Sequence, residues 1–262
     1  MLSQIQSLLP DFPQSERIHY FPIIDSTNTY AKQLAANGAP EGTVILADQQ
    51  TGGRGRLGRS FSSPAGMGIY LSMILRPNCP PAELMHLTCA AGLAASNAVA
   101  AVTGRVPGIK WTNDLILARR KLGGILTELS VNPATGNVDW VVVGVGINCC
   151  QKEQDFPEEI RNIAISLGLP TARRAELVRA LISELTNMGQ ELLQNKAQIL
   201  QSFRDRCVTI GQTVSILRGE EVSHGTAMDV DDQGALVVRY DDGHIASVTS
   251  GEVSIRGMYG YI

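Results

Sequence analysis

The sequence predicts two unequal domains, a larger one that mixes β-strands and α-helices and a small all-β domain that follows it. Residues 140–147 (WVVVGVGI) are almost all apolar, which is typical of a strand covered on both faces. Residues 175–193 carry apolar side chains on one face at helical spacing. Beyond residue 209, short β-rich runs alternate with turn formers, a pattern typical of a small barrel. We therefore place the domains at residues 1–208 and 209–262.

The N-terminal elements are expected to be a strand and a helix. Residues 19–24 form the strand candidate, and apolar side chains then recur at helical spacing as far as Ala35. Ser26 is a natural cap for this helix. The same junction also suits a pocket, because Ser26, Thr27 and Asn28 present hydroxyl, amide and backbone N–H groups. Both roles can hold at once.

Three further elements surround a stretch rich in glycine and arginine. Residues 43–47 form a buried strand that leads into the stretch, and residues 69–75 form another strand after it. Residues 80–102 are expected to form a helix, because proline is favoured at the first helical position. Its apolar part, residues 88–103, carries polar side chains and is expected to be a packed helix that is too polar to span a bilayer.

The rest of the larger domain is expected to contain strands and two helices, at residues 109–111, 115–117, 122–126, 140–147, 175–193 and 197–203. Residues 140–147 are the expected central strand, and Gly144 and Gly146 leave room for something to lie against it. The all-β domain is expected to have strands at residues 213–217, 226–230, 235–240, 245–248 and 253–256. Asp242-Gly243 is a strong signal for a tight hairpin.

The composition is typical of a soluble globular protein. The apolar fraction is 44% and the charged fraction 18%. A net charge of −3 and a pI near 5.8 argue against a protein that binds nucleic acid through its backbone. The five cysteines are odd in number and lack metal-ligand spacing, so we expect reduced thiols in a cytoplasmic protein. The first residues lack the pattern of a signal peptide, and we expect no membrane association.

Residues 52–59 (GGRGRLGR) combine two residue types that suit anion binding. Glycine lets the main chain approach a ligand closely, and arginine offers a planar fork of donors that fits phosphate or carboxylate. Ordering such a loop costs roughly 1–2 kcal/mol of backbone entropy per residue. We therefore expect the loop to be disordered when empty and folded over a bound ligand. Taken alone, the stretch also fits a solvated basic turn or an RNA-binding arginine-glycine segment.

Other segments add polar groups with a chemical use. Asn113 and Asp114 lie side by side after a strand and are suited to holding Mg²⁺ through oxygen ligands. Lys121 precedes glycines that let a ligand approach the sheet, and Asn148 ends the central strand. No serine–histidine–acid set, reactive-cysteine context or phosphate loop is visible. If the protein is an enzyme, we therefore expect it to work by positioning and charge neutralisation. Arginines, a lysine and Mg²⁺ around a nucleotide would allow a bound carboxylate to attack the α-phosphate, so that pyrophosphate leaves and an acyl-adenylate remains.

The order and spacing of these motifs resemble those of the biotin–protein ligases, or biotin–[acetyl-CoA-carboxylase] ligases. The matching segments are Asp25-Ser26-Thr27-Asn28, Gln50, 53–59, Ser63-Pro64, 110–114, 121–126 and 144–148. The similarity runs from about residue 18 to residue 256. It implies an α+β catalytic domain, in which a mixed β-sheet packs with helices as in class II aminoacyl-tRNA synthetases and biotin ligases. It also implies that a small Src-homology-like β-barrel follows.

The resemblance also implies roles for individual residues. The implied biotin contacts are Ser26, Thr27, Asn28, Gln50, Arg54, Gly55, Arg56, Lys121 and Gly123. The implied ATP and adenylate contacts are Arg54, Arg56, Lys110, Asn113, Asp114, Lys121 and Asn148. Arg56 and Lys121 would be the catalytic groups, and Asp114 would hold Mg²⁺.

The implied acceptor is the biotin carboxyl carrier protein of acetyl-CoA carboxylase, whose lysine would attack the adenylate and release AMP. Two positions depart from the family pattern: Phe61 replaces the usual tryptophan, and Thr112 the usual proline. The chain begins close to the catalytic domain, so we expect a monofunctional enzyme without a winged helix-turn-helix and without operator binding. Family members often pair through the catalytic sheet, so a homodimer stays open.

Two alternatives also stay open. Lipoate ligation is a related chemistry on a related fold, but Ser26, Thr27, Asn28 and Gln50 favour the ureido ring, which lipoate lacks. An RNA-binding module that uses residues 52–59 requires RNA affinity that depends on salt. The acidic pI argues against that alternative.

Overall fold

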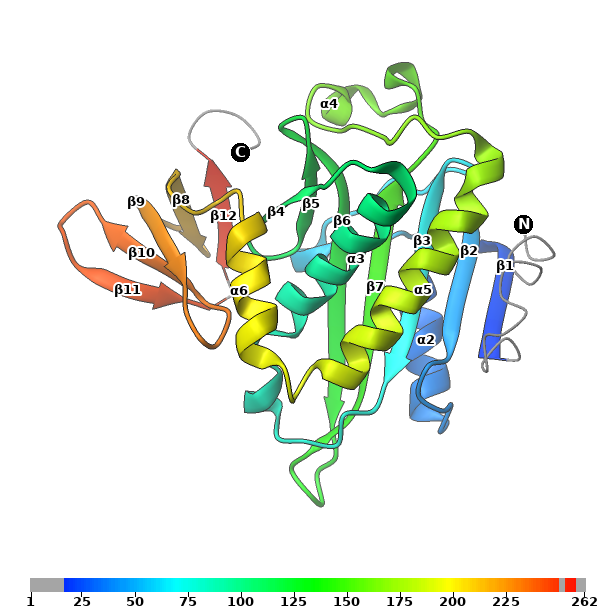
Figure 1. Ribbon diagram of the computed structural model, residues 1–262, viewed down its shortest axis with the longest axis horizontal. Helices are drawn as coiled ribbons and strands as arrows, with labels where there is room; N and C mark the ends of the chain where they lie inside the picture. The colour runs from blue at the N-terminus through cyan, green and yellow to red at the C-terminus, as the bar shows by residue number, and fades with distance from the viewer. Residues whose placement is uncertain (1–16, 250–252, 258–262) are drawn as a thin grey trace.

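The structure, a computed structural model, describes residues 17–249 and 253–257. The larger part contains a seven-stranded sheet (Figure 1). Its strands are β1 (Ile18–Ile24), β2 (Val44–Gln50), β3 (Gly68–Leu75), β4 (Gly108–Lys110), β5 (Asp114–Leu117), β6 (Arg120–Val131) and β7 (Val138–Asn148). They follow the order β1-β2-β3-β7-β6-β5-β4. β1 pairs with β2 in parallel and the other neighbours are antiparallel, so the sheet is mixed, as expected.

The prediction of a central strand is confirmed by β7, which lies in the middle of the sheet. Its side chains alternate between two packed layers. Val141, Val143 and Val145 join the main core, whereas Trp140 and Val142 belong to a second cluster on the opposite face. The glycines at positions 144 and 146 continue the second face without side chains. This face therefore has free space above its main chain near the end of β7.

Helices cover both faces of the sheet. In Figure 1, α3 (Leu87–Thr103) and α5 (Arg174–Glu191) cross in front of it, and α2 (Thr27–Ala36) lies behind. α6 (Lys196–Arg206) runs beside α3. The short helices are η2 (Arg56–Gly58), η3 (Pro81–Leu84), η4 (Glu153–Asp155), α4 (Glu158–Arg161) and η5 (Thr171–Arg173).

The helix expected over residues 80–102 is divided in two. The prolines begin only a short 3-10 turn, and α3 starts at Leu87. His86 separates the two pieces because its backbone (φ −86°, ψ 0°) lies in the region used by turns. The expectation that this segment is too polar to span a membrane was also wrong. By length and composition Pro81–Thr103 is apolar enough to cross a membrane, with a mean hydropathy of 1.4 over its most apolar 18 residues. However, 61% of those residues are buried inside the protein, as in a core helix.

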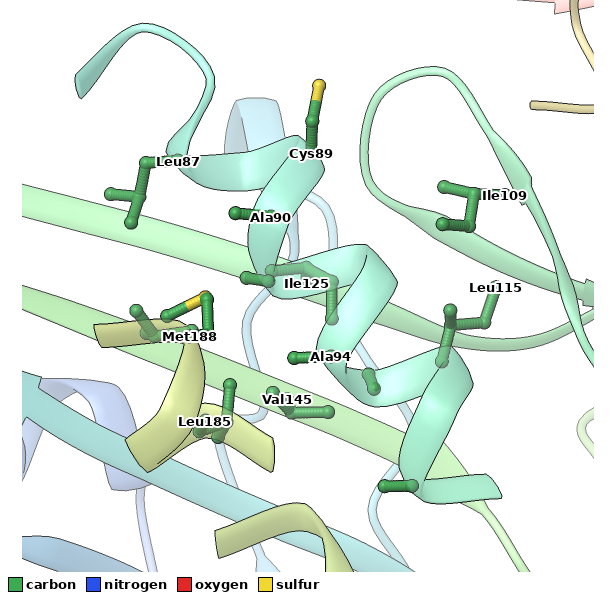
Figure 2. Close-up of a cluster of buried hydrophobic side chains, with 14 of the residues drawn as sticks. Leu87, Cys89, Ala90, Ala94, Ile109, Leu115, Ile125, Val145, Leu185 and Met188 are labelled. Atoms are coloured by element: carbon green, nitrogen blue, oxygen red, sulfur yellow. The ribbon is translucent and has the colours of Figure 1, made fainter. Parts of the chain in front are cut away.

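The main core lies between the sheet and the helices α3 and α5. Figure 2 shows the small side chains of Ala90 and Ala94 on α3 close to Ile125 and Val145 of the sheet. Leu185 of α5 joins the same cluster. Alanines on α3 allow the helix to approach the strands closely, which explains the alanine-rich composition of this segment.

Several expected strands differ in length from those observed. β6 continues to Val131, well beyond residues 122–126; its later part alternates the half-buried polar residues Glu128 and Ser130 with the exposed apolar residues Leu129 and Val131. β4 ends at Lys110, so Trp111 lies just outside a strand. The expectation concerning a signal peptide falls on residues 1–16, outside the described residues.

The C-terminal part is a second, five-stranded sheet. Its strands are β8 (Thr213–Arg218), β9 (Glu221–Val230), β10 (Leu236–Tyr240), β11 (Ile245–Val248) and β12 (Val253–Gly257). Neighbours pair antiparallel in the order β11-β10-β9-β8-β12, and the sheet fits a small Src-homology-like domain. The five expected strands are confirmed, although β9 begins earlier than expected, at four exposed residues that include the apolar Val222.

The turn between β9 and β10 packs against the larger part. Trp111 Nε1 donates to Gly234 O at 2.9 Å, and Trp111 N donates to Thr209 Oγ1 at 2.8 Å. Gly234 has φ +81°, and a Cβ there would lie 3.2 Å from His86 Cα. Glycine therefore provides both the left-handed turn and the close approach. Trp111 is 4% exposed and belongs to the main core.

Candidate functional site

A cavity of about 370 Å³ lies on the α2 face of the sheet, within the size range of small-molecule sites. Its polar and charged lining comes from α2, β2, residues 54–61 and the β4–β6 strands. It includes these expected site residues: Ser26, Thr27, Asn28, Gln50, Arg54, Gly55, Arg56, Lys110, Asn113, Asp114 and Lys121. Segments far apart in the sequence thus meet around one cavity.

The start of α2 forms one wall. Ser26 is the N-cap, as expected, and its Oγ accepts from Thr29 N at 3.5 Å. Thr27 N donates to Gln50 Oε1 at 2.9 Å, and Thr27 Oγ1 lies 3.1 Å from the same oxygen. Gln50 Nε2 in turn donates to Ser63 Oγ at 2.9 Å. The helix cap and the neighbouring strand therefore hold one another in place, so this wall is preorganised.

Asn28 lies on the floor, directly over β7. Its Oδ1 lies 2.6 Å from Ser72 Oγ, and its Nδ2 donates to Leu126 O at 3.2 Å. A Cβ at Gly144 would lie 2.0 Å from Asn28 Oδ1, so only glycine allows this approach. The space predicted above β7 is thus partly occupied by a side chain of the protein itself.

Residues 53–61 form a folded-back loop across the cavity. Arg54 and Ser60 make a β-bridge, Gly55 N donates to Arg59 O at 2.7 Å, and Phe61 N donates to Gly53 O at 2.9 Å. Leu57, at the tip, is left-handed (φ 54°) and 56% exposed. Whether the loop orders only with ligand stays a prediction.

Arg56 extends from this loop to the far side of the cavity. Its Nη1 donates to Asn113 Oδ1 at 3.2 Å. Burial lowers the pKa of the Arg56 guanidinium; the carboxylate of Asp114 opposes this shift, and the charge of Arg59 adds to it. The guanidinium nevertheless remains protonated at neutral pH. A permanent positive charge is therefore held inside a partly desolvated cavity.

Phe61 lies where the loop returns to the sheet. A Cβ at Gly146 would lie 2.7 Å from Phe61 Cε1, and the Phe61 ring packs edge-on against Tyr70 at 6.4 Å between centroids. Tyr70 is buried and donates to Pro64 O at 3.0 Å. Phe61 thus packs on the cavity floor at the position where the family usually has tryptophan.

The opposite wall carries a compact charged group from β4, β5 and β6. Lys110 pairs with Asp114 in the β4–β5 register, and Lys121 Nζ lies 2.6 Å from Asp114 Oδ1. Asn113 Nδ2 donates to Asp114 Oδ1 at 3.2 Å and to Ile125 O at 3.2 Å. Lys110 is buried, with 9% exposure, so its ammonium is directed by the fold and is not a solvated strand end.

Two expected site residues do not line the cavity in the described part of the chain. Asn148 donates to Ile165 O at 3.1 Å and accepts from Gln151 Nε2 at 3.2 Å, and these bonds tie β7 to the following segment. At Gly123, a Cβ would lie 2.3 Å from Gly146 O, so this glycine serves strand packing. Its neighbour Gly124 lines the cavity instead.

Sequence reasoning missed several residues that build the site. Ser72 is buried in the middle of β3 and had no local signal. Glu128 lies beyond the predicted end of its strand. Arg174, 2% exposed, donates to Gly68 O and pairs with Asp48 Oδ1 at 2.9 Å, which fixes the ends of β2 and β3. Arg59 is exposed and also lines the cavity.

Comparison with known proteins gives two family matches. Residues 20–148 match the biotin/lipoate A/B protein ligase family, and residues 209–256 match the biotin protein ligase C terminal domain. The chain is 32% identical to the bifunctional ligase/repressor BirA of Bacillus spizizenii over 97% of this chain and 78% of the relative. It is 33% identical to the biotin–[acetyl-CoA-carboxylase] ligase of Mycobacterium tuberculosis, over 87% of this chain and 85% of the relative.

A solved structure shares the same architecture. The biotin protein ligase of Aquifex aeolicus in complex with biotin and ATP superposes with a TM-score of 0.73 at 30% identity. The match covers 92% of this chain and 98% of that one, so both sheets take part in the similarity.

Proposed function

Because this chain belongs to the biotin protein ligases, we propose that its cavity activates biotin with ATP to biotinoyl-5'-AMP and transfers biotin to a carrier-protein lysine. The proposed acceptor is the biotin carboxyl carrier protein of acetyl-CoA carboxylase. One observation supports this most directly: a neutral polar wall and a cationic wall face each other across one cavity, and Arg56 extends from the loop toward the cationic wall.

The neutral wall suits the head of biotin. Thr27, Gln50 and Ser26 present hydroxyl and amide groups that are fixed by a helix cap and a strand end. A ureido ring carries a carbonyl acceptor and N–H donors, and such a head is matched by hydroxyl and amide partners. We assign this wall to the ureido ring, with the biotin tail directed along the β7 glycines toward Lys121.

The cationic wall suits the reacting phosphate. Arg56, Lys110 and Lys121 would surround the α-phosphate and the biotin carboxylate and offset the charge that builds up between them. The carboxylate oxygen attacks the α-phosphorus, the bond to the β-phosphate oxygen breaks, and pyrophosphate leaves. The acceptor lysine then attacks the carbonyl carbon of the adenylate, and AMP leaves with the bonding electron pair. The loop over the cavity would keep water away from the adenylate between the two steps.

The donor set is compatible with Mg²⁺. Asp114 is the acidic residue among the described lining residues, and the Asn113 amide is beside it. Mg²⁺ commonly takes one or two carboxylates from the protein and its other ligands from phosphates and water. We propose Asp114 as the protein ligand; the bound ion would neutralise phosphate charge while the biotin carboxylate attacks the α-phosphorus.

The test is intact-mass analysis of the apo carrier protein after incubation with this chain, biotin and Mg-ATP. We expect one added biotin on the carrier. Lys121→Ala and Arg56→Ala should each lower the labelling rate by at least about 100-fold, the loss typical for a group that stabilises charge in the transition state. Lys152→Ala, at an exposed lysine outside the cavity, is the matched control. Full labelling by both cavity variants would refute these roles.

The same assay separates biotin from lipoate. A parallel reaction with lipoate and Mg-ATP should leave the carrier mass unchanged, because lipoate has no ureido ring for the neutral wall. Efficient lipoylation without biotinylation would favour the alternative ligase activity.

A further inference from the structure

Glu128 on β6 contacts two different parts of the site. Its Oε2 accepts from Asn28 Nδ2 at 3.0 Å, and Asn28 lies on the cavity floor. Its Oε1 lies 3.6 Å from Arg54 Nη1 on the loop and 2.6 Å from Lys32 Nζ on α2. A single carboxylate thus joins the loop, the floor and the helix behind it.

Asn28 continues this contact along a line of polar groups under the cavity. Asn28 Oδ1 lies 2.6 Å from Ser72 Oγ, which lies 2.8 Å from Thr27 Oγ1. Thr27 meets Gln50, as described above, and Gln50 Nε2 donates to Ser63 Oγ. The line begins at Arg54 and ends where Ser63 Oγ donates to Phe61 O at 3.0 Å, so it joins the two ends of the loop.

The carboxylate also determines which groups donate along this line. A carboxylate accepts only, so Asn28 must turn its amide nitrogen toward Glu128 and its Oδ1 toward Ser72. Ser72 then donates to Asn28, and the Thr27 hydroxyl is left to donate to Ser72 or Gln50. The donor pattern offered to a ligand at the neutral wall therefore depends on a residue outside the cavity lining.

Glu128 is ionised in this setting. Burial raises its pKa, but hydrogen bonds from Lys32 and Asn28, together with the charges of Lys32 and Arg54, outweigh burial and bring the pKa below its usual value. Lys32 is close and Arg54 is farther away, on a loop whose arginine is 49% exposed. The carboxylate can therefore keep its charge whether or not the loop engages it.

We propose that Glu128 is a positioning residue for the ligase reaction. Through its contact with Arg54, Glu128 couples closure of the loop to the orientation of Asn28 beneath biotin. Biotin that fixes the floor favours the loop position in which Arg54 meets Glu128, and the closed loop in turn favours the oriented floor. This inference rests on the proposed function, because the ligand on the neutral wall is taken to be biotin.

A double-mutant cycle tests the coupling. Glu128→Gln keeps the shape of the side chain and removes its charge, and Arg54→Ala removes the loop contact. Each should weaken biotin binding by about 5- to 10-fold, and the double variant should weaken it by about the same factor and not by the product, as for residues that act together. The dissociation constant for biotin is measured calorimetrically, and KM for biotin, KM for ATP and kcat are measured with the carrier.

Lys32→Met combined with Arg54→Ala is the matched control, because Lys32 contacts the same carboxylate oxygen from helix α2 and not from the loop. In this control the two effects on biotin binding should multiply. In Glu128→Gln, KM for ATP should change by less than about twofold, since the contacts of Glu128 are at the biotin end of the cavity. Glu128→Asp serves as a second variant should Glu128→Gln fail to fold.

The outcomes separate the two proposals. If the unmodified protein binds no biotin, the proposed function fails. If it binds biotin but the effects of Glu128→Gln and Arg54→Ala on the dissociation constant multiply, the inference about Glu128 is overturned and the function stands. The same holds if the Lys32 cycle shows equal coupling.

Discussion

The Lys121 ammonium lies 2.6 Å from the Asp114 carboxylate, across the hairpin formed by β5 and β6. Asp114 thus holds a cation of the site and is also the proposed Mg²⁺ ligand. A group that orients a reacting side chain typically changes activity by about 10- to 100-fold when it is replaced.

Asp114→Asn should therefore lower kcat/KM for ATP by about 10- to 100-fold and raise the Mg²⁺ concentration that gives half-maximal rate. KM for biotin should change less, because the neutral wall is not affected. Asp139→Asn breaks a pair of 3.5 Å with Arg76, away from the cavity, and should have no effect on either constant. An unchanged Mg²⁺ requirement in Asp114→Asn would contradict the metal assignment.

Gly144→Ala should destabilise the protein, because its Cβ would lie 2.0 Å from Asn28 Oδ1. We expect a loss of about 1–3 kcal/mol in the free energy of unfolding, as for overpacking elsewhere, together with weaker biotin binding. Gly92→Ala, within helix α3, is the control, because its Cβ would lie at an ordinary contact distance of 3.4 Å from Ile109. Chemical denaturation should show Gly92→Ala to be neutral or up to about 1 kcal/mol more stable.

Trp111→Phe should weaken the contact between the two sheets. The variant leaves Gly234 O with only the weak Cys89 thiol donor at 3.8 Å, and a poorly satisfied buried acceptor costs up to about 1–3 kcal/mol. Trp140→Phe, at the other tryptophan of the chain, provides the comparison for lost ring volume. Equal losses for both variants in urea unfolding would show that the hydrogen bond adds nothing.

His86 makes stability depend on pH. Its Nε2 donates to Leu192 O at 2.8 Å, and no described residue hydrogen-bonds its buried Nδ1. Burial lowers the pKa of His86; the bond to Leu192 opposes the shift, and the charge of Lys196 adds to it. The unfolded state therefore binds the proton more readily, and stability is lost as pH falls below about 6.5, the ordinary value. His86→Gln, which retains a donor, should flatten this slope in denaturation curves collected from pH 5 to 8.

The arginine-glycine loop should become ordered with its ligands. Amide hydrogen exchange in residues 52–59 is expected to slow when biotin and ATP are added together, since ordering the loop requires compensating contacts. Exchange at α3 in the core should not change. Equally slow exchange with and without ligands would show that the loop is already closed in the free protein.

Local patterns were sufficient to predict many parts of this fold. Ser26 as a helix cap, the central strand at β7 and the turns of the second sheet depend on residues close together in the sequence. Thr27 was placed in a pocket from its position between a strand and a helix, and Gln50 from the family resemblance; the contact between them agrees with both.

Contacts between distant residues could not be predicted in this way. Glu128 lies in a half-exposed part of β6 and becomes part of the site only through Asn28, which is 100 residues away. Trp111 and Gly234 are separated by 123 residues and had no shared local signal. At Asn148 the strand end was predicted, but not the direction of the side chain, which turns to Ile165 and not into the cavity.

Neighbouring residues of β7 point to opposite faces of the sheet, one toward the main core and the next toward the cavity. Val143 and Val145 pack in the main core, whereas Gly144 and Gly146 leave room on the cavity side for Asn28 and Phe61. A shift of one position in the pairing of this strand would exchange the two sets and place valine methyl groups where Asn28 and Phe61 lie on the cavity floor. Evolutionary change at residues 143–146 should therefore be governed by different pressures: stability alone at the two valines, and both stability and turnover at the two glycines.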